Sequence, residues 1–270
     1  MCDLLGLTFN VPITAKISLN IFQERGAENS DGWGLAFYTD NTLQIVKEAR
    51  SAIGSELYDF MERYVSSHTI ISHVRRSTRG IPSYLNTHPF YRRCKIGSEN
   101  REIAFAHNGT LTQHNKLRLR EFTPIGETDS EHLMCHLLDA ISTQVLGSWE
   151  EDDFAFIEHK LREINQERNT LNCIFSDGSY LFCYSDVNDH NNGLRFVKQE
   201  QPFRKIELSS PEAQLGFIDI STDKKSAVPP VATGYIISTR ILTNEPWTEF
   251  NNGELIIFDE GRIVYPHNRA

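Results

Sequence analysis

The chain begins with Met1-Cys2-Asp3-Leu4-Leu5-Gly6-Leu7-Thr8-Phe9. Leu5, Leu7 and Phe9 are apolar with a period of two, which predicts a β-strand with one buried face. Cys2 would then lie at the very start of this strand, and we expect it in an edge position. The segment therefore places the first cysteine at the end of a sheet.

Cys2 is a candidate nucleophile. A small second residue is compatible with removal of Met1, which would leave a cysteine with a free α-amine. Such an amine has an ordinary pKa of about 7.7 to 8.0, so it can relay the thiol proton without a histidine partner. A terminal Thr or Cys activated by its own amine is a known catalytic arrangement. A surface cysteine without function is the competing interpretation.

Periodicity along the rest of the chain predicts strands and helices in irregular order. Turns are expected at Asp31–Gly34 and Asn108-Gly109. The expected strands are 35–38, 43–46, 68–74 and 103–106, with further strands within 171–184, 231–243 and 254–265. The expected helices are 57–65, 154–167 and one that begins near Thr128, where Thr-Asp-Ser-Glu matches a capping box. Because no regular βαβ alternation is present, we expect one α+β domain over 1–270, with polar excursions around 186–230.

Composition excludes several classes of function. The net charge of −9 argues against binding nucleic acid or anionic membranes. The first residues lack the pattern of a signal peptide, and no apolar run is long enough to span a bilayer. The five scattered cysteines lack the spacing of a zinc site and are typical of reduced thiols. We expect a cytoplasmic protein with no metal or organic cofactor, no nucleic-acid partner and no membrane.

Six motifs in order resemble those of the class-II glutamine amidotransferases. They are Cys2, Arg25-Gly26 with Asp31-Gly32-Trp33-Gly34, His73-Val74-Arg75-Arg76-Ser77-Thr78, Asn86-Thr87-His88-Pro89, His107-Asn108-Gly109 and Asp129-Ser130-Glu131. The start of the chain, Gly126–Glu131 and Glu245-Pro246-Trp247 are most similar to stand-alone YafJ-type members, so the resemblance covers nearly the whole chain. It implies an N-terminal-nucleophile hydrolase fold, a four-layer αββα sandwich of two stacked, mainly antiparallel sheets.

Glutamine presents a carboxylate, an ammonium and an amide, and the motifs offer a group for each. Arg75 is the candidate for the carboxylate, because its planar fork makes two parallel hydrogen bonds. Asp129, at a helix N-terminus, is the candidate for the ammonium. The Asn108 side chain and the Gly109 N–H would form the oxyanion hole for attack by Cys2. We expect Thr78 and His88 to line or order the substrate loop, and no histidine to act as the base.

The sequence leaves the substrate open. Larger amidotransferases often carry Trp and His beside the arginine, where this chain has Arg76 and Arg79. Six basic residues and no acidic one fall between 64 and 98: Arg75, Arg76, Arg79, Arg92, Arg93 and Lys95. They favour a substrate with an extra carboxylate, such as a γ-glutamyl peptide; a solvated basic loop is the alternative.

We expect an amidohydrolase that releases ammonia or an amine from glutamine or a γ-glutamyl compound, because 270 residues leave no room for a second catalytic domain. Two alternatives remain. One is a glutaminase subunit that channels ammonia to a separate synthase, and the other is a catalytically retired metabolite-binding module. A homo-oligomer is a further arrangement that the sequence leaves open.

Overall fold

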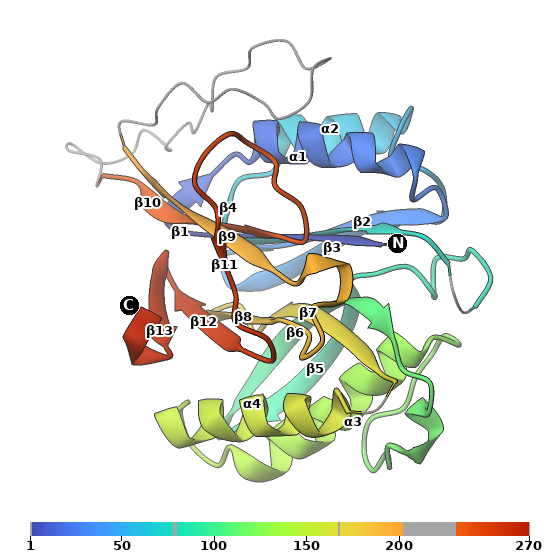
Figure 1. The fold of residues 1–270 in the computed structure, drawn as a ribbon, viewed down its shortest axis with the longest axis vertical. Helices are drawn as coiled ribbons and strands as arrows, with labels where there is room; N and C mark the ends of the chain where they lie inside the picture. The colour runs from blue at the N-terminus through green and yellow to red at the C-terminus, as the bar shows by residue number, and fades with distance from the viewer. Residues whose placement is uncertain (1, 78–79, 167, 202–230, 270) are drawn as a thin grey trace.

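The computed structural model describes residues 2–77, 80–166, 168–201 and 231–269. In these residues two antiparallel sheets stack face to face, and helices cover the outer face of each (Figure 1). The expected α+β architecture, a four-layer αββα sandwich, is confirmed. Residues 202–230 of the expected polar excursion lie outside the described part of the chain.

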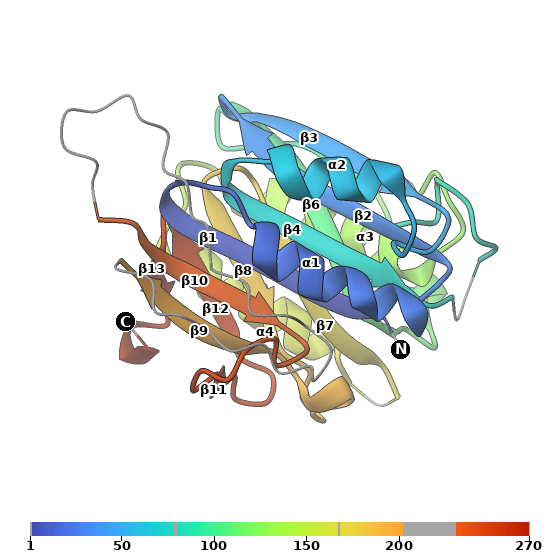
Figure 2. The same ribbon diagram turned by 90° about the horizontal axis from the view of Figure 1, so that it is seen from above.

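The first sheet carries the N-terminal segment at its centre. Its described strands run in the order β11-β9-β10-β1-β4-β2-β3, all antiparallel to their neighbours. Their bounds are Asp3–Ile13 for β1, Gly32–Thr39 for β2, Thr42–Glu48 for β3, Ser67–Arg75 for β4, Arg195–Glu200 for β9, Thr233–Ser238 for β10 and Thr248–Glu249 for β11. Figure 2 shows β1 running between β10 and β4 beneath α1.

The second sheet is ordered β13-β12-β8-β7-β6-β5 and is also antiparallel. Its strands are β5 Phe90–Ile96, β6 Glu99–Thr110, β7 Thr170–Ser176, β8 Tyr180–Tyr184, β12 Leu255–Asp259 and β13 Arg262–Tyr265. Side chains such as Leu4, Ile71 and Ile174 fill the space between the two sheets. This apolar layer fixes the first sheet over the second, and with it the residues at the strand ends.

Two helices cover each sheet. They are α1 Lys16–Glu24 and α2 Glu56–Tyr64 on the first sheet, and α3 Asp129–Gln144 and α4 Glu151–Ile164 on the second. Thr128 caps α3 as predicted, because its side chain accepts a hydrogen bond from Glu131 N at 3.1 Å. The apolar stripe that begins at Leu133 and ends at Ile141 is buried against the sheet. No helix in the described ranges is long and apolar enough to cross a membrane.

Three local predictions were wrong. The strand after Cys2 is not at an edge, because β10 and β4 flank β1 on both sides. Asp31–Gly34 is not a free turn, since Gly32-Trp33-Gly34 begins β2. Asn108-Gly109 lies inside β6, where Gly109 pairs with Leu171 of β7. In each case pairing with a distant strand overrides the local turn or edge signal.

Candidate active site

Cys2 immediately precedes β1, at the end of the central strand pair. β1 and β4 are in register with Asp3 opposite Val74, so the thiol lies beside the last residues of β4. The Cys2 Sγ is 3.2 Å from both the backbone N and the backbone O of Arg76. Burial raises the pKa of the Cys2 thiol, although the Arg76 backbone and the Arg75 charge act in the opposite direction. The thiol is therefore protonated at neutral pH and requires a proton acceptor to react.

The residue after Cys2 anchors this end of the strand. The Asp3 carboxylate is fully buried and accepts hydrogen bonds from four side chains. The donors are Arg25 Nε at 3.0 Å, Asn29 Nδ2 at 3.0 Å, Thr239 Oγ1 at 3.1 Å and Arg240 Nε at 3.0 Å. These donors come from both ends of the chain, and through Asp3 they fix the position of the neighbouring Cys2.

Arg75 is the final residue of β4 and is buried. Its guanidinium donates to Gly80 O at 3.3 Å, and its backbone O accepts from Asp31 N at 2.9 Å. Burial lowers the pKa of Arg75, while the charges of Cys2, Asp31 and Asp129 oppose that shift. A buried cation thus stands close to the thiol and to the carboxylate of the other sheet's helix.

Asn108 reaches Cys2 from the second sheet. Its Nδ2 donates to the Cys2 backbone O, and its Oδ1 is buried without a hydrogen-bond partner in the described residues. Gly109 follows at a close approach of two strands, where a Cβ would overlap the Thr170 carbonyl and lie 2.6 Å from His107 Nε2. Glycine is therefore required for packing there, not for a turn.

Asp129 is the first residue of α3 and is also buried. Its Oδ2 accepts a hydrogen bond from Leu111 N at 2.6 Å, which ties the helix to the chain leaving β6. Only half of the predicted capping box forms. The Glu131 carboxylate turns away from the helix N-terminus to accept from Gly126 N at 2.7 Å and Arg92 NH2 at 2.6 Å.

The described residues between β4 and β5, 76–77 and 80–89, are held by short polar contacts. Asp31 Oδ2 accepts from Ser77 N at 2.7 Å. The Asn86 amide donates to Ile81 O at 3.1 Å and accepts from Glu127 N at 2.9 Å, which joins the segment to the start of α3. Thr78 and Arg79 lie outside the described residues, so the expectation for Thr78 stays a prediction.

Three histidines are buried around the strand ends. The His88 ring packs 4.2 Å from the His73 ring, so His88 contacts the interior of the protein. Burial lowers the pKa of His73 to about 3 and that of His88 well below its ordinary value. Burial also lowers the pKa of His107, whose ring nitrogens contact Ser130 Oγ at 2.9 Å and Thr170 O at 3.1 Å. All three are neutral near pH 7 and are poor proton acceptors.

These low pKa values predict acid sensitivity of the fold. An unfolded histidine has a pKa near 6.5, so between pH 6.5 and about 3 the unfolded chain binds a proton that folded His73 excludes. Stability is complete above pH 6.5 and falls as the pH drops through this window, by about 1.4 kcal/mol per pH unit for each such histidine. Urea midpoints measured from pH 7 to 5 should decline less steeply for His73→Phe than for wild type. The control is His159→Gln, whose side chain is 71% exposed; equal slopes for His73→Phe and wild type would contradict the assignment.

Sequence reasoning missed Asn191. It lies in the 3-10 turn η3, His190–Asn192, and its Nδ2 donates to the Cys2 backbone O at 3.4 Å. Asp189, Asn191 and Asn192 all have positive φ angles of 56 to 60°. The buried Asp186 carboxylate holds the turn by accepting from Asn188 N at 2.7 Å. The Asn-Asn-Gly sequence signals a turn, but no local pattern links it to Cys2.

The basic residues between 64 and 98 do not form one cluster. Arg76 is exposed and adjoins Cys2 through its backbone. Arg92, Arg93 and Lys95 belong to β5, the edge strand of the second sheet. Within the described residues, Arg76 is therefore the exposed member of this set that adjoins the thiol.

The two stacked sheets and their helical layers form the sandwich of the N-terminal-nucleophile hydrolases. The family model for class-II glutamine amidotransferases matches residues 1–269. This chain belongs to that family.

The chain is also similar to known proteins over nearly its whole length. An uncharacterized protein of Methanocaldococcus jannaschii is 38% identical over 272 residues, which cover all of this chain and 72% of that protein. YafJ of Escherichia coli is 30% identical, over 98% of this chain and 100% of its own. A Pseudomonas aeruginosa crystal structure, described as a predicted glutamine amidotransferase, has a TM-score of 0.68 at 24% identity and covers 97% of this chain and 99% of that one.

Proposed function

We propose that this protein is an amidohydrolase in which Cys2, after removal of Met1, attacks the γ-amide of glutamine or of another γ-glutamyl compound. One observation carries the proposal: the Cys2 residue is contacted by Asn108 from one sheet and lies next to Arg75 from the other. A thiol, an amide donor and a cation therefore meet at one place. Family membership supports glutamine as the amide donor.

The reaction follows from the groups that adjoin the thiol. The α-amine of Cys2 accepts the thiol proton, and the sulfur adds to the amide carbon. One N–H of the Asn108 amide is engaged by the Cys2 backbone O, and the second N–H, with Gly109 N–H, donates to the oxyanion. The C–N bond then breaks, and the leaving nitrogen takes the proton back from the α-ammonium. Water, deprotonated by the same amine, cleaves the thioester and releases the γ-carboxylate.

The substrate is held by two pairs of opposite charges. The Arg75 guanidinium pairs with the α-carboxylate of the glutamyl group, and Asp129 with its α-ammonium. Both side chains are buried, so the two pairs form away from bulk water. Thr78 and His88 line or order the substrate loop, and His88 does so from its packed position on His73.

The test combines mass measurement and product release in one preparation. Intact mass establishes whether Met1 is absent, and ammonia and glutamate are measured with glutamine as substrate. A glutamine-analogue electrophile should label the processed protein at Cys2. Release of both products together with this label supports the proposal. A processed protein that is neither labelled nor active would overturn it.

Two alternatives predict different results in this test. A glutaminase subunit would be labelled but slow, and a separate synthase would stimulate its activity. A retired metabolite-binding module would bind glutamine without labelling. The retained thiol beside Arg75 and Asn108 favours a working nucleophile over the retired module.

The position of Arg76 favours γ-glutamyl peptides over free glutamine as substrates. Because it is exposed and directly follows Arg75, its guanidinium can pair with a second carboxylate on the leaving group. Exposed pairs contribute about 0.2–1 kcal/mol, so Arg76→Ala should reduce the preference for a γ-glutamyl peptide over glutamine by a factor of about 1.4 to 5. The ratio of the two kcat/KM values measures this preference, with Arg93→Ala as the matched control. An unchanged ratio in Arg76→Ala would remove the argument for the peptide substrate.

Asn191 is expected to position the nucleophile. Asn191→Gly removes the bond to the Cys2 backbone O and preserves the positive φ angle, so kcat should fall about threefold to tenfold without loss of thermal stability. Asn192→Gly is the matched control, because Asn192 has the same backbone conformation and is exposed. Equal kcat values for the two variants would show that the Asn191 contact is incidental.

A further inference from the structure

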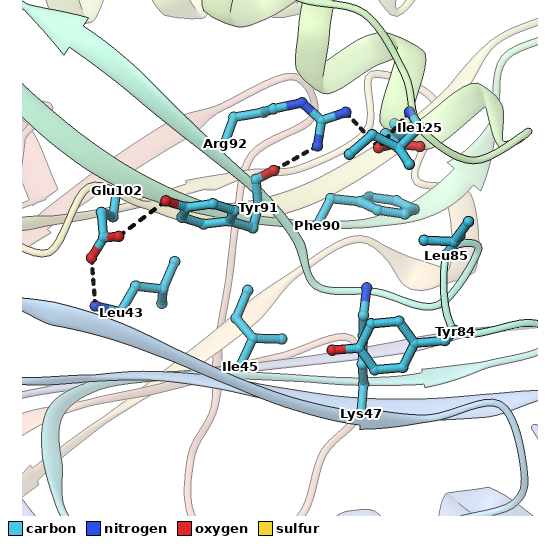
Figure 3. A pocket seen from close by; sticks show the side chains of 11 residues that line it. Leu43, Ile45, Lys47, Tyr84, Leu85, Phe90, Tyr91, Arg92, Glu102 and Ile125 are labelled. Carbon is cyan, nitrogen blue, oxygen red and sulfur yellow. Dashed lines mark hydrogen bonds and ion pairs between the residues drawn. The ribbon is translucent and has the colours of Figure 1, made fainter.

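A cavity adjoins Tyr84 and Leu85, in the segment that precedes β5. It has a volume of about 330 Å³ and opens between β3 and β5, and Figure 3 shows the side chains around it. Its walls include Ile45, Phe90 and Ile125, with the ring of Tyr84 along one side. None of the four residues Cys2, Arg75, Asn108 and Asp129 lines it, so this cavity is separate from the candidate active site.

The carboxylates of this cavity are already engaged. Glu102 accepts from Leu43 N at 2.9 Å and from Tyr91 OH at 3.0 Å. Glu131 accepts from Arg92 NH2 at 2.6 Å, besides its two bonds to backbone N–H groups. Because protein donors already occupy the oxygens of both carboxylates, these groups are poorly placed to bind a cationic ligand.

Two cations line the cavity. Arg92 already donates to Tyr91 O, Thr123 O and Glu131 Oε1, so Lys47 is the better placed of the two to bind a ligand. Figure 3 shows its side chain extending from β3 past Tyr84 toward Phe90. The Nζ lies 4.7 Å from the centre of the Tyr84 ring and donates to Thr87 O at 2.7 Å and Pro89 O at 3.3 Å. An ammonium has three N–H donors, so a third can be directed to an acceptor in the cavity. Apolar and aromatic walls around one such donor are typical of a small-molecule site.

We propose that this cavity binds a small monocarboxylate with an aromatic or branched aliphatic body. The carboxylate accepts a charge-assisted hydrogen bond from Lys47 Nζ, and the apolar body packs against Phe90, Ile45 and Ile125. Lys47 also holds the carbonyls on both sides of His88, which packs on His73 near Arg75. A ligand on Lys47 therefore contacts the same segment that carries His88.

Calorimetric titration of the full chain with 3-phenylpropionate at pH 7 tests the proposal, with the neutral 3-phenylpropionamide as the matched ligand. Wild type should bind the acid about tenfold more tightly than the amide, because the amide lacks the charge that pairs with Lys47. Lys47→Met should abolish this preference. Lys160→Met is the matched control, since Lys160 also lies beside an aromatic ring, 6.0 Å from the centre of Phe156. It should retain the preference.

A second variant tests the proposal even if Lys47→Met does not fold. Ile125 is 68% exposed, so Ile125→Trp can fill the cavity from its rim without disturbing the core. It should weaken binding of the acid by about tenfold or more while the circular dichroism spectrum stays unchanged. Absence of saturable binding to wild type, or equal binding by wild type and Ile125→Trp, would overturn the proposal. Because the readout is binding, it is independent of amide hydrolysis.

Discussion

Replacing Cys2 with alanine is expected to lower the rate of glutamine hydrolysis by about 10⁴-fold or more, because no covalent intermediate can form. Substrate binding should change little, since Arg75 and Asp129 are untouched. The rate of ammonia release and the binding of glutamine, measured on the same protein, separate the two effects. Cys2→Ala should also prevent labelling by a glutamine-analogue electrophile.

The matched control is Cys94→Ala. Cys94 is buried in β5, and burial raises the pKa of its thiol to about 12, so it is neither exposed nor reactive. It should retain activity and labelling. Activity that persists in Cys2→Ala, with normal loss of Met1, would mean that another group carries the reaction.

Asn108→Ala is expected to have the second largest effect, a fall in kcat of about 10² to 10³-fold with a small change in KM. The oxyanion exists only after attack by sulfur, so its donor contributes to the transition state and little to binding of the amide. The control is Asn100→Ala, an exposed asparagine on the same strand. The values of kcat and KM for glutamine, measured on both variants, show whether Asn108 stabilises the oxyanion. A kcat within threefold of wild type would reduce Asn108 to a support for the Cys2 backbone.

Much of the layered fold could be predicted from short-range patterns. Alternation in the first nine residues predicted β1, and the capping signal at Thr128 predicted α3, because both patterns are local and strong. The wrong turn at Asn108-Gly109 has a different origin. Its glycine is required by the Thr170 backbone of β7, a neighbour about sixty residues away that a local signal does not reveal.

The candidate site likewise contains residues that local motifs predict and one that they do not. Cys2, Arg75, Asn108 and Asp129 could be selected because they stand in recognisable motifs, and the structure places them at adjoining strand and helix ends. Asn191 could not be selected, since its contact with Cys2 depends on a turn held by Asp186. A basic run in the sequence likewise suggested one charged patch, whereas three of its members lie on the edge strand β5.

The four hydrogen bonds to Asp3 bear on how the protein is best produced. They hold Asp3 in register with β4, so a fusion partner placed ahead of Cys2 would lie directly beside the thiol. In the proposed mechanism, any residues left ahead of Cys2 after removal of an N-terminal purification tag would block the α-amine that accepts the thiol proton. A purification tag is therefore better placed after Ala270 than ahead of Cys2.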